Sequence, residues 1–416
     1  MLAVLKNRNF TLLWFAGLIS IIGNWVLLAA LPFYIFELTG SAMATAGVFM
    51  AFMAPGIFLG SIAGVFVDRW DKLRTMLVVN LIQAGVVLLL TMVQSAEQSW
   101  IIFLVLVIES SVAQFFGPAE NSLLPKLVSE EHLVAANSLN SMNDNLARLV
   151  GPAIGGLVLA VYGFSSVVLI DALSFGLSAT LIFIVMLTYQ AGSNPLNASA
   201  VSAMTLRVRI AEVWAEWQGG FKIVRSESIL KITFALIGVA LFADAIISAI
   251  FVIFLQQDIG FSSVEFGYIM TARGVGGLIG GLAIAQFGAR INPRHMLSVS
   301  LLVLSGVILA AVNFTTLPAF LIAMVVAGIP AVGMMIAVQT IFQKRTPEAY
   351  LGRVFGLFQT VVMLLMFLGS WVAGLLGEAV PTIQVLLFAA SIYVVAGLSG
   401  IWMLRNRKTK VELLPN

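Results

Sequence analysis

Twelve apolar segments constrain this sequence more than any other feature. Each holds about 20 residues or more, the length with which a helix crosses the hydrocarbon core of a bilayer. Because lipid offers no partner for backbone N–H and C=O groups, such spans are predicted to be helices rather than barrel strands. We therefore predict an all-α integral membrane protein with twelve transmembrane helices. The segments cover approximately residues 10–36, 42–67, 75–96, 99–119, 138–162, 165–189, 230–256, 262–287, 293–314, 318–342, 353–377 and 381–404.

The residue composition excludes a soluble globular domain and several classes of function. Charged residues make up only 10% of the 416 positions, whereas a soluble domain carries about 25%. The chain has no cysteine, and its two histidines, His132 and His295, lie far apart in the sequence, so we expect no metal site and no cofactor. Phosphate-loop, nucleophile-elbow and zinc-protease motifs are missing from the sequence, which predicts that the protein is not an enzyme.

The glycine pattern of the first half recurs in the second half. A shift of 220 positions places Gly56 and Gly60 on Gly276 and Gly280, and internal similarity of this kind is typical of transporters built from repeats. Glycines four residues apart also let neighbouring membrane helices approach closely. We therefore predict two pseudo-symmetric six-helix bundles.

The one long polar stretch sets the predicted domain boundaries. We expect an N-terminal bundle over residues 1–189, a cytoplasmic linker over 190–229, and a C-terminal bundle with a short cytoplasmic tail over 230–416. The linker contains an amphipathic pattern that suits a helix on the membrane surface. It is interpreted either as a tether between the halves or as a regulatory, partner-binding segment. The apolar face of the pattern comprises Ile210, Val213, Trp214 and Trp217.

Basic residues fall on one side of the predicted membrane. Of the 22 lysines and arginines, only Arg148 and Arg273 lie inside spans, and the others gather in the tails and in the loops of one side. The opposite loops carry acids such as Glu97, Asp258 and Glu378. The positive-inside rule therefore places both termini in the cytoplasm. The same distribution explains the net charge of +3 without a nucleic-acid partner.

The loop between the second and third spans carries five charges. It resembles the signature of the major facilitator superfamily of transporters, G-x-x-x-D-R-x-G-R followed by further basic residues. It differs from that signature at Asp71, where the family usually has glycine, and at Leu73, where the residue is often basic. The resemblance implies two six-helix bundles around a central cavity that works by alternating access. It also implies that Asp68 forms a cytoplasmic gate with the start of the eleventh span, near Arg353. The matched positions are Gly64, Asp68, Arg69, Lys72 and Arg74.

The fifth span resembles the exporter motif of the same superfamily, G-P-x-x-G-G. The match covers Gly151, Pro152, Gly155 and Gly156, while Ala147 replaces an upstream glycine of the motif. Three further stretches resemble the branch that holds macrolide-efflux proteins and enterobactin exporters. This resemblance implies a monomeric transporter of a small-molecule substrate, embedded in the lipid bilayer of a bacterial cytoplasmic (inner) membrane. The stretches are residues 116–119, 171–175 and 346–354.

Five acidic residues lie inside predicted spans, where an ionisable group is costly and a functional role is the default hypothesis. Asp144 and Arg148 are four residues apart and share a helical face, and Pro152 weakens the helix beside them. Their spacing is equally consistent with a structural ion pair and with a coupling pair. Asp171 lies near the start of its span, where we expect a helix-end hydrogen bond. The five acids are Glu109, Asp144, Asp171, Asp244 and Glu265.

Asp244 differs from the others because no basic residue lies within one helical turn of it along the chain. The shift of 220 positions places it on Asn24 of the first span, so the two residues are predicted to face a central site between the halves. Burial disfavours the charged form of a carboxyl group, which makes Asp244 and Glu109 candidates for a proton switch. The alternative is that each carboxyl only makes a hydrogen bond to a neighbouring helix.

Taken together, these patterns predict a secondary active transporter. We expect proton-coupled efflux of small amphiphilic compounds, drug-like or siderophore-like. Since the sequence has no ATP-binding motif, a gradient would have to drive transport. The alternatives are a facilitator, an importer or a lipid flippase of the same fold and, in another class, a membrane receptor or scaffold that transports nothing.

Overall fold

The computed structural model describes residues 4–189, 218–347 and 350–405. Within these ranges the regular structure is entirely helical. The N-terminal half contains α1 (Arg8–Thr39), α2 (Ala42–Arg69), α3 (Lys72–Val87), α4 (Trp100–Ala113), α5 (Phe116–Leu127), α6 (Leu133–Tyr162) and α7 (Phe164–Thr188). The C-terminal half contains α9 (Ser228–Ile253), α10 (Ser263–Phe287), α11 (Pro293–Ala311), α12 (Leu317–Arg345), α13 (Leu351–Ala379) and α14 (Thr382–Arg405).

The membrane spans agree with the predicted set of twelve. Among the described residues, 11 helical segments are long and apolar enough to cross a bilayer, with α4 and α5 together forming one segment, Ala96–Leu127. The remaining span is α6, whose apolar part is the shorter stretch Leu146–Tyr162. The prediction of an all-α membrane protein with twelve spans is therefore confirmed.

Local signals explain where several helices begin and end. The side chains of Asn7, Ser41 and Asp71 accept hydrogen bonds from backbone N–H groups in the first turns of α1, α2 and α3, as polar N-cap residues do. Gly40 ends α1 with a φ of 62°, a left-handed conformation that glycine adopts without strain. These caps allow tight turns between long apolar helices.

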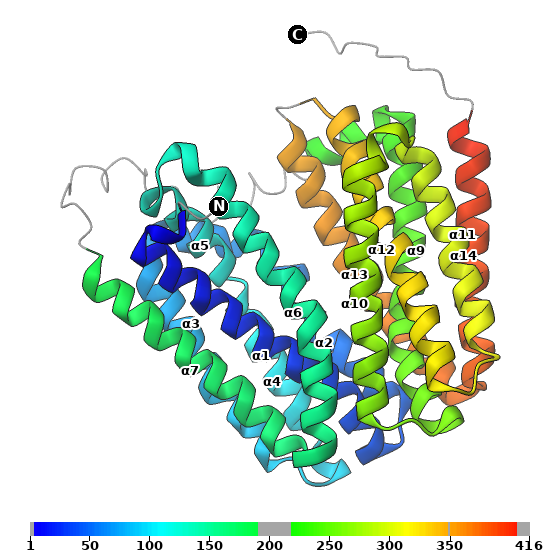
Figure 1. Cartoon of the computed structure of the whole chain (residues 1–416), viewed down its shortest axis with the longest axis horizontal. Helices are drawn as coiled ribbons and strands as arrows, with labels where there is room; N and C mark the ends of the chain where they lie inside the picture. The colour runs from blue at the N-terminus through cyan, green and yellow to red at the C-terminus, as the bar shows by residue number, and fades with distance from the viewer. Residues whose placement is uncertain (1–3, 190–217, 348–349, 406–416) are drawn as a thin grey trace.

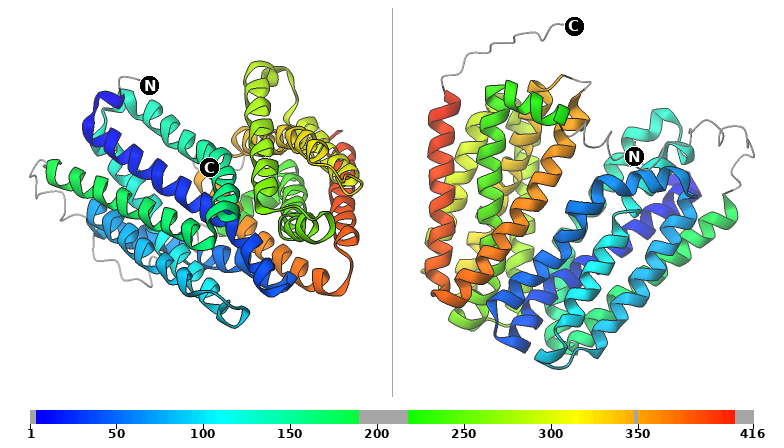
Figure 2. Two further views of the ribbon diagram at one scale, coloured as in Figure 1. Left: turned by 60° about the horizontal axis from the view of Figure 1, so that its bottom comes forward. Right: turned by 180° about the vertical axis from the view of Figure 1, so that it is seen from behind.

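The helices form two bundles with matching internal packing (Figures 1 and 2). In the first bundle α1 packs against α6 and α7, and in the second bundle α9 packs against α13 and α14. Likewise α3 packs against α7, as α11 does against α14. This correspondence confirms the predicted pseudo-symmetry of the two halves.

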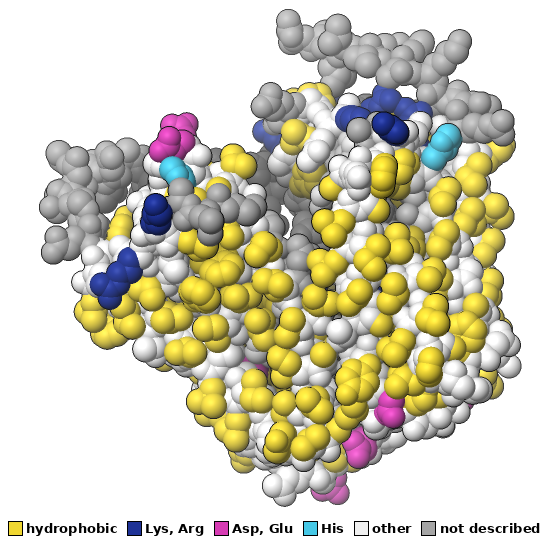
Figure 3. All heavy atoms as spheres, viewed as in Figure 1, with side chains coloured by type: hydrophobic (Ala, Val, Ile, Leu, Met, Phe, Trp, Pro, Cys, Tyr) yellow, Lys and Arg dark blue, Asp and Glu magenta, His cyan; other side chains and the backbone are white. Residues whose placement is uncertain are grey.

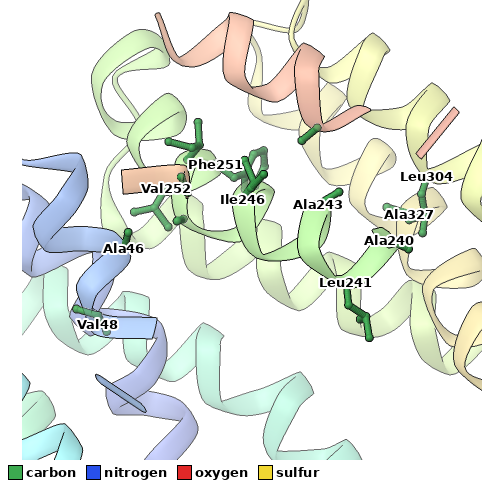
Figure 4. Close-up of a cluster of buried hydrophobic side chains, with 14 of the residues drawn as sticks. Ala46, Val48, Ala240, Leu241, Ala243, Ile246, Phe251, Val252, Leu304 and Ala327 are labelled. Atoms are coloured by element: carbon green, nitrogen blue, oxygen red, sulfur yellow. The ribbon is translucent and has the colours of Figure 1, made fainter. Parts of the chain in front are cut away.

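Among the described spans, the one that contains α9 is the most deeply buried, and small side chains allow its close packing. Ala240 and Ala243 are fully buried, and Figure 4 shows them in the buried cluster that also holds Leu304 of α11 and Ala327 of α12. Close packing of this kind stabilises helix association in lipid, where burial of apolar surface gives little driving force.

The two bundles converge at one end and separate at the end where both chain termini lie (Figure 1). Two helix pairs join them, α2 with α13 and α6 with α10. In Figure 3 a hollow separates the bundles at the wide end, where the lysines and arginines on this face also gather. The molecule is therefore V-shaped and open toward the end that the sequence predicts to be cytoplasmic.

The predicted amphipathic helix of the linker lies outside the described residues, because the description resumes at residue 218. Residues 218–226 are helical and approach Arg353, since Gly220 lies against its backbone. The domain boundaries at 189 and 230 remain predictions.

Candidate functional site

The signature loop forms the tight turn between α2 and α3. The ammonium of Lys72 donates to the carbonyl oxygens of Val67 at 2.7 Å, Asp68 at 2.9 Å and Trp70 at 3.0 Å. A cation at this place neutralises the unpaired carbonyls at the end of α2. Asp71 accepts from the backbone N–H of Arg74 at 2.8 Å. The residue that departs from the family signature therefore caps α3.

The predicted gate between Asp68 and the start of α13 falls at the wide end of the molecule. Asp68 and Arg69 are both exposed. The guanidinium of Arg353 lies 5.1 Å from the centre of the Tyr350 ring, a distance typical of a cation–π contact. The latch between Asp68 and Arg353 stays a prediction for a conformation in which this end is closed. Gly64 lies within α2, where an added Cβ atom would meet no other atom within 4 Å.

The glycines of the exporter motif let α6 approach two other helices. A Cβ atom at Gly151 would lie 3.1 Å from the carbonyl carbon of Trp25, and one at Gly155 would lie 3.2 Å from that of Val26. Both distances place the α6 backbone almost in contact with α1. Pro152 lies between them inside α6, which continues without a break.

Gly156, the last residue of the same motif, contacts the other bundle. A Cβ atom there would lie 2.9 Å from Cα of Gly267 on α10. A real Cβ could not be accommodated at that distance without movement of the backbone. One motif therefore packs α6 within its own bundle and also forms part of the junction between bundles.

The pair α2 and α13 closes the narrow end by a hydrogen-bonded cap. The hydroxyl of Ser41 donates to Oε1 of Glu378 at 2.7 Å, and the backbone N–H of Met43 donates to the same oxygen at 3.1 Å. A carboxylate at the start of a helix also interacts favourably with the helix dipole. Glu378 thus connects the end of α13 to the first turn of α2.

Three polar side chains that are far apart in the sequence meet inside the first bundle. The amide of Asn24 on α1 donates to Oε1 of Glu109 on α4 at 2.8 Å. Asp171 on α7 is close enough to Glu109 to interact with it electrostatically. Glu109 is only 3% exposed and Asp171 is fully buried. We call Asn24, Glu109 and Asp171 the N-bundle acid cluster.

Asp171 does not make the helix-end contact expected for it. It lies in the second turn of α7 and is fully buried, facing α1, because a Cβ atom added at Gly23 would lie 2.8 Å from its Oδ1 atom. Ser174 donates weakly to the same oxygen at 3.5 Å. Oδ2 of Asp171 has no hydrogen-bond partner among the described residues. The expectation failed because α7 turns this residue inward toward α1 rather than toward a helix end.

Of the predicted pair of Asp144 and Arg148, only the Arg148 side chain is described, because the side chain of Asp144 lies outside the described set. Arg148 is exposed, and its guanidinium lies 5.2 Å from the centre of the Trp25 ring. This contact with α1 gives Arg148 a partner other than the one its spacing suggests. The choice between a structural and a coupling pair stays open.

Asp244 has a basic partner, contrary to what its own helix indicates. Oδ1 of Asp244 lies 3.5 Å from Nη2 of Arg273 on α10 and accepts a hydrogen bond from the Tyr393 hydroxyl on α14 at 3.2 Å. The lack of a basic residue within one turn of its own helix therefore does not leave Asp244 without a cation partner. The sequence shows that Arg273 is a basic residue inside a span. It does not show the pairing, because the partner of Asp244 lies on another helix and not within one turn of its own.

Asn24 and Asp244 line different cavities, and the predicted common site between the halves stays a prediction. Asn24 lines a polar cavity within the first bundle, and Asp244 lines a separate cavity within the second. The second cavity has an empty volume, including its open mouth, of about 610 Å³. Its wall is largely apolar and includes Phe251, Met270 and Leu304. Each of the two residues instead anchors a polar cluster in its own half.

Comparison with known proteins gives a consistent result. Residues 1–415 match the family model described as transmembrane secretion effector. An uncharacterised MFS-type transporter of Bacillus subtilis is 28% identical, covering 91% of this chain and 89% of its own. The macrolide efflux protein A of Streptococcus pyogenes is 27% identical, over 89% of this chain and 90% of that protein. The multidrug efflux pump Tap of Mycobacterium tuberculosis is 26% identical, over 94% of this chain and 92% of that protein.

Solved structures show the same fold. A bacterial homologue of the iron transporter ferroportin, in its inward-facing state, superposes with a TM-score of 0.69 over 96% of this chain and 98% of its own. Its sequence identity of 15% makes this a likeness of fold alone.

Proposed function

The chain belongs to the transmembrane secretion effector family of major facilitator transporters, and on that basis we propose that it exports small amphiphilic compounds in exchange for protons. The relatives named for macrolide and multidrug efflux support efflux of drug-like compounds. Siderophore-like compounds share the same amphiphilic character and belong to the same proposal. The proposed location is a bacterial inner membrane with both termini in the cytoplasm, and the proposed unit is a monomer.

The N-bundle acid cluster carries the proposal of proton coupling. Glu109 and Asp171 are both buried. Among the described residues, Glu109 accepts from the amide of Asn24 and Asp171 from the hydroxyl of Ser174, and neither partner carries a positive charge. Two buried carboxyl groups that interact electrostatically favour a state in which one of them holds a proton, because desolvation and mutual repulsion both disfavour two negative charges. We infer that the pair holds a proton when buried and releases it when water reaches it.

Asp244 is a weaker candidate for this role than its sequence position indicates. Its carboxylate already has a cation partner, because Oδ1 lies 3.5 Å from Nη2 of Arg273. A stable ion pair in the second bundle and a protonated pair in the first give the two halves different roles. We therefore assign proton binding to Glu109 and Asp171.

The available energy suffices for useful efflux. One proton that crosses a potential of about 100 mV releases about 2.3 kcal/mol. At about 1.4 kcal/mol per tenfold change, this sustains a concentration ratio of about 50. A single coupled proton per substrate therefore meets the requirement.

Transport assays in reconstituted vesicles test the proposal. A panel of macrolides, dyes and siderophores would be measured with and without an imposed pH gradient. We expect uphill movement of at least one compound only when the gradient is present. Flux that follows the substrate gradient and does not depend on pH would instead establish a facilitator. Movement of labelled lipid between the leaflets would establish a flippase. Saturable binding with no flux of any compound would establish a receptor or scaffold.

A further inference from the structure

A large polar cavity lies within the first bundle. Its empty volume, including the open mouth, is about 1260 Å³. The described residues that line it belong to α1, α3, α4, α5, α6 and α7, and therefore to one bundle. One water molecule takes up roughly 30 Å³ of the liquid, and cavities that stay empty are apolar ones. We therefore expect this cavity to hold water.

Polar side chains face the cavity from neighbouring turns of its helices. Ser20 and Asn24 on α1 are four residues apart, and Asn137 and Asn140 on α6 are three residues apart. Residues at these spacings share one face of a helix. Each of these two helices thus turns a polar face to the cavity, although polar groups are costly inside a membrane bundle.

The mouth of the cavity lies at the wide end of the molecule. Asn121 on α5 and Asn137 on α6 are the two exposed residues among those that line the cavity. Both lie near the loop that joins α5 to α6, and α6 begins at the wide end (Figure 1). The cavity therefore opens toward the end that the sequence predicts to be cytoplasmic.

The inner end of the cavity lies one side chain away from the N-bundle acid cluster. Asn24 lines the cavity, and its amide donates to Oε1 of Glu109 at 2.8 Å. Ala113 on α4 and Phe175 on α7 also line the cavity. Each stands four residues after one acid of the cluster and shares a helical face with that acid. Since Glu109 is itself buried, the Asn24 amide stands between its carboxyl group and the cavity.

The charges on the lining favour the passage of protons through this cavity over the cavity of the second bundle. Among the described residues that line the first cavity, Glu120 is the one charged residue. Arg273 lines the second cavity, whose wall is largely apolar. A fixed positive charge repels a hydronium ion, whereas a carboxylate attracts it. An apolar wall also offers water no hydrogen-bond partners.

We propose that this cavity is the path by which protons pass from the N-bundle acid cluster to the cytoplasm, separate from the hollow between the bundles. The proposal rests on the proposed proton-coupled efflux. Asn24 is a positioning residue, and water reaches Glu109 when the Asn24 side chain turns away from it. The O–H bond of the Glu109 carboxyl group then breaks, and the carboxylate keeps the electron pair. The proton joins a water molecule as hydronium and moves along the cavity water to the mouth.

Cysteine labelling tests whether water fills the cavity, since the chain has no native cysteine. Ser20→Cys places a thiol in the lining one turn before Asn24. Inside-out vesicles expose the cytoplasmic side and would be treated with the small, impermeant thiol reagent MTSET. We expect labelling of Ser20→Cys, because a thiol reacts as the thiolate and is inert in apolar surroundings. Ser178→Cys should stay unlabelled, since Ser178 is buried in the same bundle and is not among the residues that line the cavity.

A second variant keeps this test valid if Ser20→Cys does not fold. Ile21 also lines the cavity and is partly exposed, so Ile21→Cys should be labelled as well. Failure of MTSET to label either folded variant would overturn the proposal, because the cavity would then hold no continuous water.

Transport by the labelled variants tests whether protons use this path. Uphill transport under a pH gradient and downhill substrate exchange would be measured on the same vesicles before and after labelling. We expect the MTSET adduct to lower uphill transport by about tenfold or more, because its fixed positive charge repels hydronium ions. Exchange should persist, since it needs no net proton movement.

Each other outcome contradicts a different part of the proposal. Unchanged uphill transport after labelling would show that protons take another route. Loss of exchange together with uphill transport would show that the substrate uses this cavity, which overturns a separate proton path. Wild-type protein that shows no gradient-driven transport would refute the proposed function itself, and this result needs no label.

Discussion

At the scale of single residues, the side chains inside the membrane acquire their roles from partners on other helices. Asp244 and Arg273 are 29 positions apart in the sequence, yet their side chains pair within the second bundle. Glu109 bonds to Asn24 across 85 positions. A carboxyl with a cation partner and a carboxyl with only an amide and another acid differ in which protonation state they favour. The structure thus separates a carboxyl that pairs with a cation from one that bonds to an amide.

The ion pair in the second bundle predicts a mutational cycle. Arg273→Gln leaves Asp244 without its cation, and we expect a loss of about 1–3 kcal/mol, between the values for exposed and buried pairs, because both side chains are partly exposed. Asp244→Asn together with Arg273→Gln should recover much of the folded yield, since no unpaired charge remains. Yield and unfolding temperature of the single and double variants in detergent provide the measurement. A double variant no better than Arg273→Gln would show that the pair does not govern stability.

Much of the residue-level arrangement could not be predicted from the sequence. Local patterns correctly identified Glu109, Asp171 and Asp244 as acids inside spans, because this needs only hydropathy along the chain. They did not identify Arg273 and Tyr393 as partners of Asp244. Such contacts depend on the rotation and tilt of helices that are distant in the sequence, and one turn of a single helix carries no information about either.

At the scale of elements, glycines determine where helices touch. The sequence predicted where the exporter motif allows close packing, but it did not predict which helices pack there. Its spacing indicated close packing, while only the structure shows that Gly151 and Gly155 contact α1 and that Gly156 contacts α10. The twelve spans were predictable because each is a local run of apolar residues. The linker helix lies outside the described residues and stays a prediction.

The contact between α6 and α10 predicts the effect of a single methyl group. Gly156→Ala should impair closure of the narrow end, because its Cβ would lie 2.9 Å from Cα of Gly267, and overpacking of this kind typically costs about 1–3 kcal/mol. Gly176→Ala is the matched control on α7, where a Cβ meets no atom within 4 Å. Efflux rate and labelling of a Met43→Cys reporter would be compared in both backgrounds. Equal labelling and efflux would contradict a closing role for this contact.

The signature loop predicts a second effect on closure, now at the wide end. Asp68→Asn should strongly reduce transport while leaving expression and unfolding temperature unchanged, because it removes the charge proposed to engage the start of α13 when that end closes. Glu131→Gln, an exposed acid in another loop at the same end, serves as the control. Normal efflux by Asp68→Asn would remove this residue from the gate.

At the scale of the whole molecule, the two bundles form a V whose narrow end is closed by α2, α6, α10 and α13. If the wide end faces the cytoplasm, as the positive-inside rule predicts, this shape is the one expected of a transporter open to the cytoplasm. Cysteine labelling tests the orientation, since the chain has no native cysteine. In intact cells an impermeant reagent should label Glu97→Cys and leave Lys72→Cys unlabelled. Labelling of Lys72→Cys would reverse the assigned orientation.

We propose that the pair of Glu109 and Asp171 exchanges the proton that drives efflux, and a variant of Glu109 tests this most directly. Glu109→Gln keeps a hydrogen-bond acceptor for Asn24 but cannot release a proton. Vesicles containing wild type, Glu109→Gln or Asp244→Asn would be assayed for uphill efflux under a pH gradient and for downhill substrate exchange, which needs no net proton movement. We predict that Glu109→Gln loses uphill efflux and retains exchange. Full gradient-driven efflux by Glu109→Gln, with loss of it in Asp244→Asn, would contradict the account and assign the proton to the second bundle.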